Sequence, residues 1–395
     1  MTRNARVTCL LLLTATAACQ ERRVAPMAPR LSLNSSAAAC PTPANAIVTD
    51  EAGLNSALAA ATPGEVIGLG AFFGVTADII VNTPNVTLTC AAAGAGLFAA
   101  NPNVVDLIDI IDSGVTLDRL VLDASAAQDG PMTATNDNGI TGIATRVTYT
   151  NSTVTCGPGT CAFFIGASRS VVSNNHFTSP GSFTGLQFQA STDPTNTVVL
   201  DPVDSVRVQG NTIIATGPSV GPVQGGIRVV RGTGVVISGN VVTGPWMNSA
   251  GLTSLTAARV ERNQFEGAVV RGIRLSGGNV LMFGSLVSQS LFSSNSITGA
   301  GVAGIFAFRA CNNAFVGNNL QGNAGNVGII FPTLSGANTF VGDPTVVVDD
   351  GAFDCDGDGV IDANIIVGAG AVLHGVNLGQ DVSGAVRQVH GVTVQ

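Results

Sequence analysis

The chain has 395 residues, of which only 11% are charged, and its 17 basic and 25 acidic side chains give a net charge of −8. A negative chain without a basic cluster is a poor ligand for nucleic acid, so we expect no nucleic-acid partner. The 49 glycines and the 5% share of aromatic residues are typical of short strands between glycine-containing turns, which stack into one long domain.

Residues 1–19, MTRNARVTCLLLLTATAAC, have the layout of a secretory signal peptide. Two arginines precede a mostly apolar run that is too short to span a membrane. Ala-Thr-Ala at 15–17 suits ordinary signal cleavage, whereas Ala17-Ala18-Cys19 resembles a bacterial lipoprotein box in which Cys19 becomes acylated. Both alternatives predict an exported protein, either secreted or held in the bacterial cell envelope by a lipid anchor alone.

Residues 20–45 are rich in Pro, Ala and Ser and have no apolar period, which predicts a flexible linker. Asp50 and Glu51 then precede AGLNSALAAATPG, in which Leu54 and Leu58 share one helical face. This pattern predicts a short amphipathic helix. A solenoid needs a cap over the apolar end of its first coil, and this helix is well placed to supply it.

Between about residues 169 and 343 one phrase recurs: a strand-like apolar run, an Asn, a glycine-rich loop, and then Gly-hydrophobic-x-hydrophobic. The Asn copies are Asn175, Asn211, Asn240, Asn263, Asn295 and Asn318, with Asn151 extending the series backwards and Asp118 and Asp343 at the same place. A period of roughly 20 to 30 residues that carries only strands and turns indicates a β-solenoid. We expect each Asn at a tight bend, in left-handed backbone, with its side chain bonding to Asn in neighbouring coils.

These motifs resemble those of the right-handed parallel β-helix proteins of the pectin-lyase-like superfamily, over residues 46–350. The resemblance implies an all-β fold, a single-stranded right-handed parallel β-helix with three short parallel sheets around one core. It also implies that a substrate lies across one sheet and its flanking loops, but no single activity follows from the fold. Residues 351–395 are then expected to form a calcium loop and a C-terminal capping segment.

The recurring strand after each glycine-rich loop reads GLQFQ, GIRVV, GLTSL, GIRLS, GIFAF and GIIFP. If its first hydrophobic residue points inward, the outward stack is Gln187, Arg228, Thr253, Arg274, Phe306 and Ile330. Arg228 and Arg274 then lie two coils, or about 9.6 Å, apart.

Trp246 lies in the loop TGPWMNSA, which leads into the strand GLTSL. We predict that Gln187, Arg228, Trp246 and Arg274 bind a glycan, because Arg pairs with carboxylates and Trp offers a stacking face. The alternative is that each Arg solubilises an exposed strand and Trp246 packs beneath its loop.

Catalytic residues cannot be assigned from the sequence. The polygalacturonase motifs of the superfamily are not reproduced, and the chain contains no Lys. Pectate lyases combine Ca²⁺-binding acids with an Arg base, but no acid neighbours Arg228 or Arg274 in the outward stack. Polysaccharide lyase and glycoside hydrolase activity therefore both stay open.

Six cysteines lie beyond the leader, and an even number in an exported chain favours disulfides. Two of them enclose the short loop GPGT, and the other four allow three pairings, of which we favour the one that ties each terminal region to its end coil. Buried free thiols are the alternative. The predicted pairs are Cys156–Cys161, Cys40–Cys90 and Cys311–Cys355.

The segment DCDGDGVID at 354–362 matches the first part of a Ca²⁺-binding loop, with Asp at positions 1, 3, 5 and 9 and Gly at position 6. The twelfth position is Ile365 in place of Glu, so a bidentate ligand is missing unless Asp349 or Asp350 supplies it. We predict a structural Ca²⁺, with an empty solvated turn as the alternative. The predicted ligands are Asp354, Asp356, Asp358, the carbonyl of Val360, and Asp362.

Two functions are consistent with these patterns. The first is a monomeric cell-envelope protein that binds an extracellular polysaccharide along the sheet face of Arg228 and Arg274, with cleavage of that polysaccharide left open. The second is a non-catalytic surface scaffold or adhesin that binds a protein partner. The superfamily's usual work on glycans favours the first, and the missing catalytic motifs favour the second.

Overall fold

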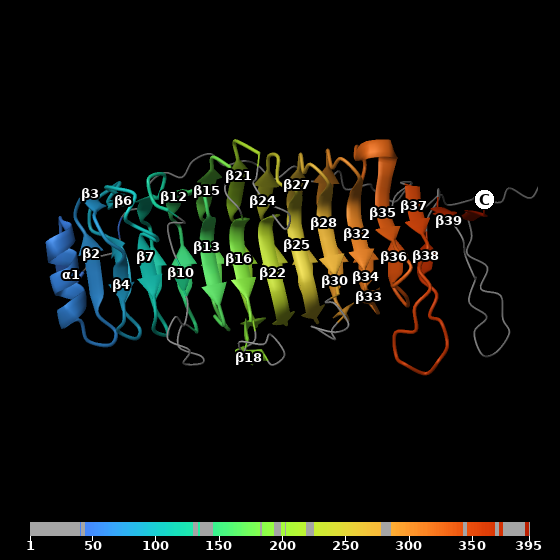
Figure 1. The fold of residues 1–395 in the computed structure, drawn as a ribbon, viewed down its shortest axis with the longest axis horizontal. Helices are drawn as coiled ribbons and strands as arrows, with labels where there is room; N and C mark the ends of the chain where they lie inside the picture. The colour runs from blue at the N-terminus through green and yellow to red at the C-terminus, as the bar shows by residue number, and fades with distance from the viewer. Residues whose placement is uncertain are drawn as a thin grey trace, which may run out of the picture. The chain divides into compact units, whose positions relative to one another are not determined.

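The computed structural model describes residues 40, 44–128, 133–134, 145–181, 184–192, 199–201, 203–218, 225–277, 286–342, 346–367, 371–373 and 392–394. Ala39–Gln395 forms one compact unit, in which short parallel strands stack side by side away from the helix α1 (Figure 1). Met1–Ala38, which contains the predicted leader and Cys19, lies outside the described residues.

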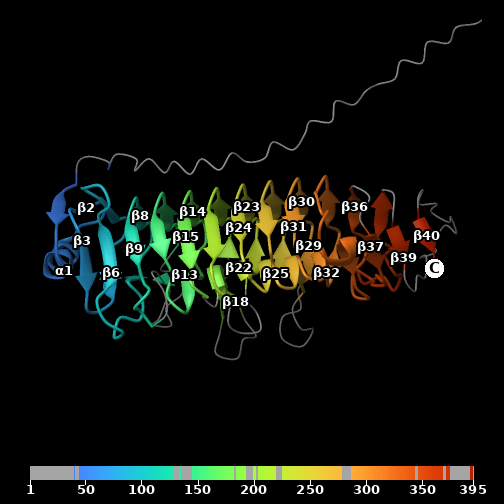
Figure 2. The ribbon, with the colours of Figure 1, turned by 90° about the horizontal axis from the view of Figure 1, so that it is seen from above.

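Three parallel sheets run along this stack, because the chain contributes strands to each sheet in turn (Figure 2). Among the described residues, the first sheet has 13 strands. In spatial order these are β1 (Ala46–Val48), β2 (Val66–Leu69), β5 (Thr87–Cys90), β8 (Thr116–Asp118), β11 (Thr148–Thr150), β14 (Val171–Ser173), β20 (Arg207–Gln209), β23 (Val236–Ser238), β26 (Arg259–Glu261), β30 (Leu291–Ser293), β34 (Ala314–Val316), β36 (Thr339–Val341) and β38 (Ile365–Val367).

The second sheet has 16 strands in the described part of the chain. Its main path is β4 (Ile79–Val81), β7 (Ile108–Ile110), β10 (Thr133–Ala134), β13 (Thr160–Ile165), β16 (Thr184–Gln189), β22 (Gly225–Thr233), β25 (Asn248–Thr256), β28 (Arg271–Ser276), β32 (Ala303–Phe308), β35 (Val327–Phe331), β37 (Val346–Asp349), β39 (Ala371–Leu373) and β40 (Val392–Val394). The short strands β19 (Val203–Asp204), β29 (Val287–Ser288) and β33 (Ala310–Cys311) pair beside this path.

The third sheet has nine strands within the described ranges. They are β3 (Phe72–Val75), β6 (Gly96–Ala99), β9 (Val121–Asp123), β12 (Thr153–Thr155), β15 (His176–Ser179), β21 (Thr212–Ala215), β24 (Val241–Thr243), β27 (Gln264–Glu266) and β31 (Ser296–Thr298). Three further elements lie outside these three sheets: the antiparallel pair β17 (Ser191–Thr192) and β18 (Val199–Asp201), and a 3₁₀ turn at Ala324–Asn326.

The core is built by the alternation that the sequence predicts. In β20, Val208 is fully buried while Arg207 is exposed. The aligned residues of the neighbouring strands, Val172 and Ile237, are fully buried as well. Inward aromatic rings stack between neighbouring coils, as Phe164 and Phe188 do with centroids 4.5 Å apart. The period-two reading of the strands is therefore confirmed.

The predicted asparagine ladder is present and buried. From Asn175 to Asn318, each side-chain Nδ2 donates to the Oδ1 of the next ladder residue, over 2.9 to 3.1 Å. Each Oδ1 also accepts a hydrogen bond from the backbone N–H of the preceding Asn. Because the ladder residues from Asn211 to Asn295 bond their neighbours in both directions, the ladder keeps the coils in register.

The prediction that each ladder Asn itself has left-handed backbone is wrong. The left-handed residue at each bend is the one before the ladder Asn, for example Asn174 with φ 57° and Arg262 with φ 56°. Asn151 occupies that exposed bend position, with φ 53°, and Ser152 takes the ladder place by donating its N–H to Asn175 Oδ1 at 2.9 Å.

Asp118 pairs in register with Thr150 on a strand and is not in the ladder. Asp343 lies outside the described residues.

The structure contains a second asparagine ladder, which was not predicted from the sequence. Asn313 Nδ2 donates to Asn338 Oδ1 at 3.0 Å, and Asn338 Nδ2 donates to Asn364 Oδ1 at 2.9 Å. This ladder runs along the N-terminal ends of strands in the 13-stranded sheet, where ACNNAF and SGANTF each place an Asn directly before a strand. The spacings of 25 and 26 residues were the available signal.

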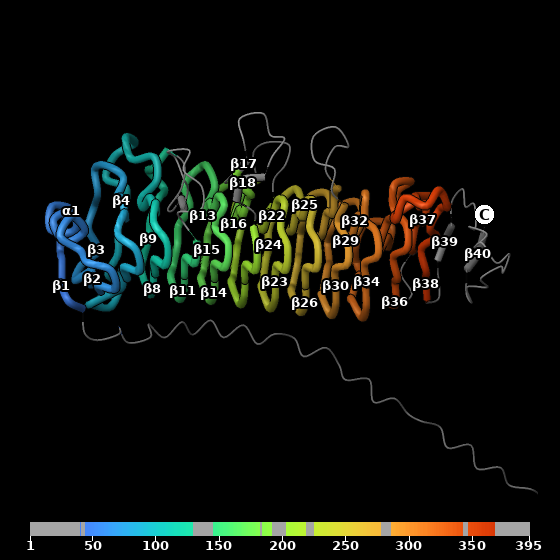
Figure 3. Tube along the Cα trace, turned by 90° about the horizontal axis from the view of Figure 1, so that it is seen from below, coloured from blue at the N-terminus to red at the C-terminus, as the bar shows by residue number. Residues whose placement is uncertain are grey.

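The predicted helix is α1 (Glu51–Ala60), which lies at the start of the stack (Figure 3). Asp50 caps it by accepting a hydrogen bond from Gly53 N–H at 2.7 Å. Leu54 and Leu58 are buried in the core, and the helix contacts β1, β3 and β4, the first strands of all three sheets. No described helix is long and apolar enough to cross a membrane.

The ends of the folded unit differ from the predicted boundaries. Asn45, inside the predicted linker, exchanges hydrogen bonds with Val66, and Cys40 is joined to Cys90. Past residue 350, β38 pairs with β36, so the solenoid continues beyond the loop at 354–362. That loop connects β37 of the 16-stranded sheet to β38 of the 13-stranded sheet, so it is an insertion within the solenoid.

Three disulfides lie within the described residues, and they are the pairs favoured from the sequence: Cys40–Cys90, Cys156–Cys161 and Cys311–Cys355. The first joins Cys40, which precedes β1, to Cys90 at the end of β5. The third joins β33 to the loop at 354–362. The first therefore ties the beginning of the folded unit to an early coil, and the third ties the acidic loop to the coil beside it.

Candidate functional site

The outer face of the 16-stranded sheet carries the predicted arginine pair. Arg228 of β22 pairs with Gly251 of β25, and Gly251 pairs with Arg274 of β28. The two arginines therefore occupy the same outward row, two coils apart, as the repeat predicts. Gln187 precedes this row on β16 and Phe306 follows it on β32.

The residue between the two arginines is Gly251, and the prediction of Thr253 there is wrong. Ala250 and Leu252 point into the core and are fully buried, which sets the outward positions of β25 at Gly251 and Thr253. Thr253 falls in the next row, where its hydroxyl lies 2.9 Å from that of Ser276. The shift arises because Ser249 and Ala250 replace the usual Gly-Ile pair at the start of this strand.

A third arginine, Arg271, belongs to this surface and was missed. It begins β28, three residues before Arg274, and its guanidinium carbon lies 4.2 Å from the centroid of the Phe306 ring. Its Nε is buried and has no hydrogen-bond partner. The signal was the first Arg in RGIRLS, which was not counted in the outward stack because it precedes the glycine.

Arg228 and Arg271 each lie close enough to Arg274 to be affected by its charge, and none of the three has a described carboxylate as a partner. Burial lowers the pKa of Arg228 from its ordinary value, and the nearby charge of Arg274 lowers it further. The same two causes lower the pKa of Arg271, and burial lowers the pKa of Arg274. The surface defined by Arg228, Arg271 and Arg274, the arginine cluster, is thus a partly desolvated positive site that lacks a described counter-ion.

Trp246 and Gln187, two of the predicted binding residues, are both buried. Trp246 is fully buried in the core, and its Nε1 donates to the carbonyl of Thr243 at 3.1 Å, so it offers no stacking face to a ligand. The alternative, in which Trp246 packs beneath its loop, is the correct one. Gln187 keeps its place in the outward row but is 5% exposed, and its Nε2 donates to Gln189 Oε1 at 3.2 Å.

No carboxylate stands beside the arginine cluster on the described strands. The rows on either side of Arg228 and Arg274 contain Asn248, Val230, Thr253, Ser276 and Phe308. Asp109 is the outward acid of this sheet toward the N-terminal end, and the strands β10, β13 and β16 separate it from β22. The arrangement can bind an anion, but it does not bring an acid or carboxylate base to it.

The acidic loop forms a second cluster near the C-terminal end. Ligand oxygens of Asp354, Asp356 and Asp362 all lie within 4.8 Å of one another. Asp358 is not in that group, and its Oδ1 accepts a hydrogen bond from Val360 N–H at 2.8 Å. Hydrogen bonds to Asp354 from loop N–H groups, that of Gly359 first, lower the pKa of this carboxyl.

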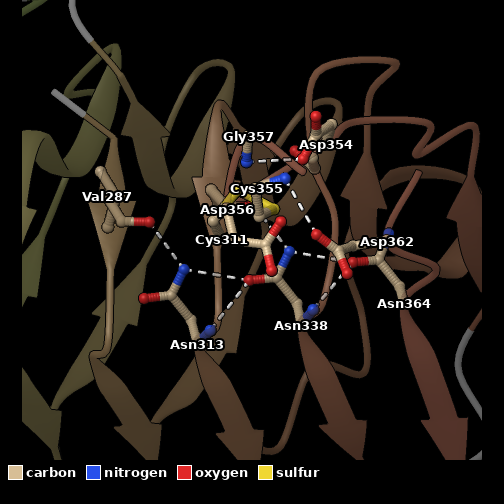
Figure 4. Close-up of a disulfide and its surroundings, with 12 residues drawn as sticks. Val287, Cys311, Asn313, Asn338, Asp354, Cys355, Asp356, Gly357, Asp362 and Asn364 are labelled. Atoms are coloured by element: carbon tan, nitrogen blue, oxygen red, sulfur yellow. Dashed lines mark hydrogen bonds between the residues drawn. A yellow bond between two sulfur atoms is a disulfide. The ribbon is translucent and has the colours of Figure 1, made fainter. Parts of the chain in front are cut away.

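This loop is tied closely to the coil beside it. Figure 4 shows Asp354, Asp356 and Asp362 beside the Cys311–Cys355 disulfide, near the ladder residues Asn338 and Asn364. Cys355 N–H donates to Asp362 Oδ2 at 2.9 Å, which joins the two ends of the loop. The disulfide and this bond hold the three carboxylates together, and carboxylate oxygens are the ligands that Ca²⁺ prefers.

Comparison with solved structures finds the same fold in proteins of low sequence identity. The A-module of the Azotobacter vinelandii mannuronan C-5 epimerase AlgE4 is 16% identical, with a TM-score of 0.51 over 88% of this chain and 96% of that one. The Dettilon tailspike protein is 12% identical, with a TM-score of 0.50 over 87% of this chain and 64% of the tailspike, so this chain spans less than two thirds of it.

No curated protein sequence matches the chain. The family described as "Right handed beta helix region" matches residues 108–265 and 193–345, which together make up more than half of the 395 residues. With its all-parallel sheets, stacked coils and buried ladders, the chain belongs to the right-handed parallel β-helix family.

Proposed function

We propose that the protein binds an acidic extracellular polysaccharide along the outer face of the 16-stranded sheet, with Arg228 and Arg274 contacting its anionic groups. The observation that carries this proposal is the arginine cluster, which has partly buried charges and no described carboxylate partner. Desolvating a cation is unfavourable unless an anion compensates it. A ligand that brings the anions supplies that compensation.

Two further features favour a polysaccharide over a small anion. The sheet presents a row of outward side chains in register over many coils, which suits an extended polymer. The same fold occurs in a protein named a mannuronan C-5 epimerase, so this architecture can serve a polymer of uronic acid. Because the described strands place no acid beside the cluster, the activity that we propose is binding without cleavage.

The test is isothermal titration of the purified protein with acidic and neutral oligosaccharides, alongside an assay for unsaturated or reducing products. Replacing both arginines (Arg228→Ala, Arg274→Ala) removes two charge-assisted contacts, so we expect affinity for acidic glycans to fall at least about tenfold. The matched control is Arg207→Ala, which removes an exposed arginine from the same coil but from the 13-stranded sheet.

Unchanged affinity in the double variant would refute the proposed site. Binding of neither acidic nor neutral glycans would favour the scaffold or adhesin function and a protein partner. Product formation that is lost in the double variant would show an enzyme with its site on this sheet.

We also propose that Asp354, Asp356 and Asp362 hold a structural Ca²⁺, since their oxygens converge within one loop near the last coils of the solenoid. Calcium would neutralise the mutual repulsion of these carboxylates and fix the loop between β37 and β38. Millimolar Ca²⁺ is expected to raise the melting temperature of the protein, and Asp356→Asn is expected to abolish that rise. A melting temperature and a binding calorimetry trace that both ignore Ca²⁺ would exclude the site.

The disulfides support a further part of the proposal, namely export to an oxidising compartment. We propose that the leader directs export and that Cys19 either carries a lipid or is removed with the leader. Mass spectrometry of the N-terminal peptide from cell-derived protein separates these alternatives. An intact leader on the mature protein would contradict both.

A further inference from the structure

The arginine cluster places its positive charges along the stack at a defined interval. Arg228 and Arg274 share one outward row and are separated by the intervening strand β25. The neighbouring positions in this row, Gln187 and Phe306, are uncharged. Along the stack, the row therefore reads neutral, positive, bare, positive, neutral.

The position between the two arginines is bare as well as uncharged. A Cβ atom built on Gly251 would meet no atom within 4 Å, so the space above this glycine is open. Arg271 stands beside Arg274 on the same strand and stacks on Phe306, so it strengthens the charge at β28 without adding any over β25.

This interval can be compared with the length of a sugar. Neighbouring strands of a sheet lie about 4.8 Å apart, which is close to the length of one unit in an extended polysaccharide. A chain that lies along the stack therefore places about one sugar unit on each coil. Anionic groups can then meet an arginine only at every second unit.

Resting on the function proposed above, we propose that the ligand presents an anionic group to this sheet at every second sugar unit, with the intervening unit over Gly251. Two kinds of polymer have this chemistry. One alternates acidic and neutral sugars, and the other is a flat ribbon of uronic acids whose successive carboxylates face opposite edges.

A carboxylate pressed onto Gly251 would lose water without gaining a cation, which is unfavourable for a charged group. An anion of the same polymer over Arg228 or Arg274 gains a charge-assisted hydrogen bond instead. The difference between these positions makes Gly251 a specificity-determining residue, because the glycine both withholds charge and leaves room for the uncharged face of a sugar.

The experiment moves one charge while keeping the number of arginines constant. The variant Gly251→Arg with Arg274→Ala puts the two cations of the row on adjacent coils, whereas the wild type has them on alternate coils. Affinity is measured by titration calorimetry with hyaluronan decasaccharide, which alternates acidic and neutral sugars, and with polymannuronate of the same length. We expect the variant to lose at least tenfold in affinity for the polymer that the wild type binds.

A second variant, Gly251→Leu, fills the open space without changing charge and is expected to weaken the same interaction several-fold. The added Cβ meets no neighbour, so the melting temperatures should stay close to that of the wild type. Preference of the wild type for one polymer identifies which of the two sources the site accepts.

The possible results separate this inference from the proposed function. If the moved-charge variant binds as tightly as the wild type while the double alanine variant does not bind, charge number alone decides affinity and the alternate spacing is refuted. If neither polymer binds the wild type, both the inference and the acidic-polysaccharide function are refuted. A tenfold loss in the moved-charge variant, with Arg207→Ala unchanged, supports both.

Discussion

Asn240 shows how one buried side chain joins three coils. Its Oδ1 accepts hydrogen bonds from the backbone N–H of Asn211 at 2.9 Å and from Asn211 Nδ2 at 3.0 Å. Its Nδ2 donates to the carbonyl of Val208 and to Asn263 Oδ1. The sequence predicted this ladder because Asn recurs with the coil period, but not the left-handed residue that precedes each member.

Replacing Asn240 with Ala leaves buried donors and acceptors in the neighbouring coils without partners. Each such group costs about 1–3 kcal/mol, so we expect the free energy of unfolding to fall by at least about 2 kcal/mol. Denaturant unfolding followed by circular dichroism measures this loss. The control Gln264→Ala truncates an outward amide on β27 and should cost less than about 0.5 kcal/mol. Equal effects of the two substitutions would show that the ladder bonds do not stabilise the fold.

Trp246 and Gly226 illustrate a residue-scale feature that the sequence left open. A Cβ on Gly226 would lie 3.4 Å from Trp246 Nε1 and closer still to Val242, so the glycine makes room for the buried indole. From the sequence, a Trp in a loop is equally consistent with a stacking surface. Only the packing of β22 against the loop before β25 shows that the ring points inward.

At the scale of elements, β37 and β38 lie in different sheets and are joined through the second ladder. Asn364, just before β38, donates from Nδ2 to Asp349 Oδ1 at 2.8 Å, and Gly351 N–H donates to the same oxygen at 2.9 Å. Asp349 is 7% exposed, and burial is the main cause that raises its pKa above the usual 3.8. Burial therefore disfavours the ionised form of Asp349, the carboxyl group at the end of this ladder.

This raised pKa predicts how stability depends on pH. Between the unfolded and the folded pKa of Asp349 the native state binds more protons, so the contribution of this residue to stability is largest below the unfolded value and is lost as the pH rises through the folded value. Asp349→Asn keeps an oxygen acceptor and removes the charge. We expect the variant to melt at a higher temperature than the wild type at neutral pH, with the difference shrinking toward pH 3. A difference that grows toward low pH would contradict the assignment.

At the scale of the whole folded unit, the helix α1 solves the problem of the open first coil. The solenoid ends in unpaired strand edges, and an exposed edge is a template for pairing with another chain. The helix covers the beginning of the stack with Leu54 and Leu58, which belong to the same core cluster as the strands. Its capping role therefore combines core burial with protection of the edge.

Leu54→Asp with Leu58→Asp should release this cap. A buried, unpaired charge is among the most destabilising changes, so we expect a loss of more than about 3 kcal/mol and self-association through the opened edge. Light scattering at increasing protein concentration detects the association. The control Asn55→Asp adds the same kind of charge to an exposed position of α1 and should remain monomeric. Monomeric behaviour of the double variant as well would mean that the edge needs no cover.

The sequence by itself determined the β-helix, its cap and the two-coil interval of Arg228 and Arg274, whereas it favoured the disulfide pairs among several possible pairings. These follow from local properties, namely the alternation of apolar residues, the recurrence of Asn and the capping chemistry at Asp50, which repeat whatever the exact length of each loop. The tertiary structure alone decided that Gly251 lies between the arginines, that Arg271 joins them over Phe306, and that Trp246 is buried. These features depend on which residues stack across coils, and loops of unequal length shift that register in a way that local patterns do not encode.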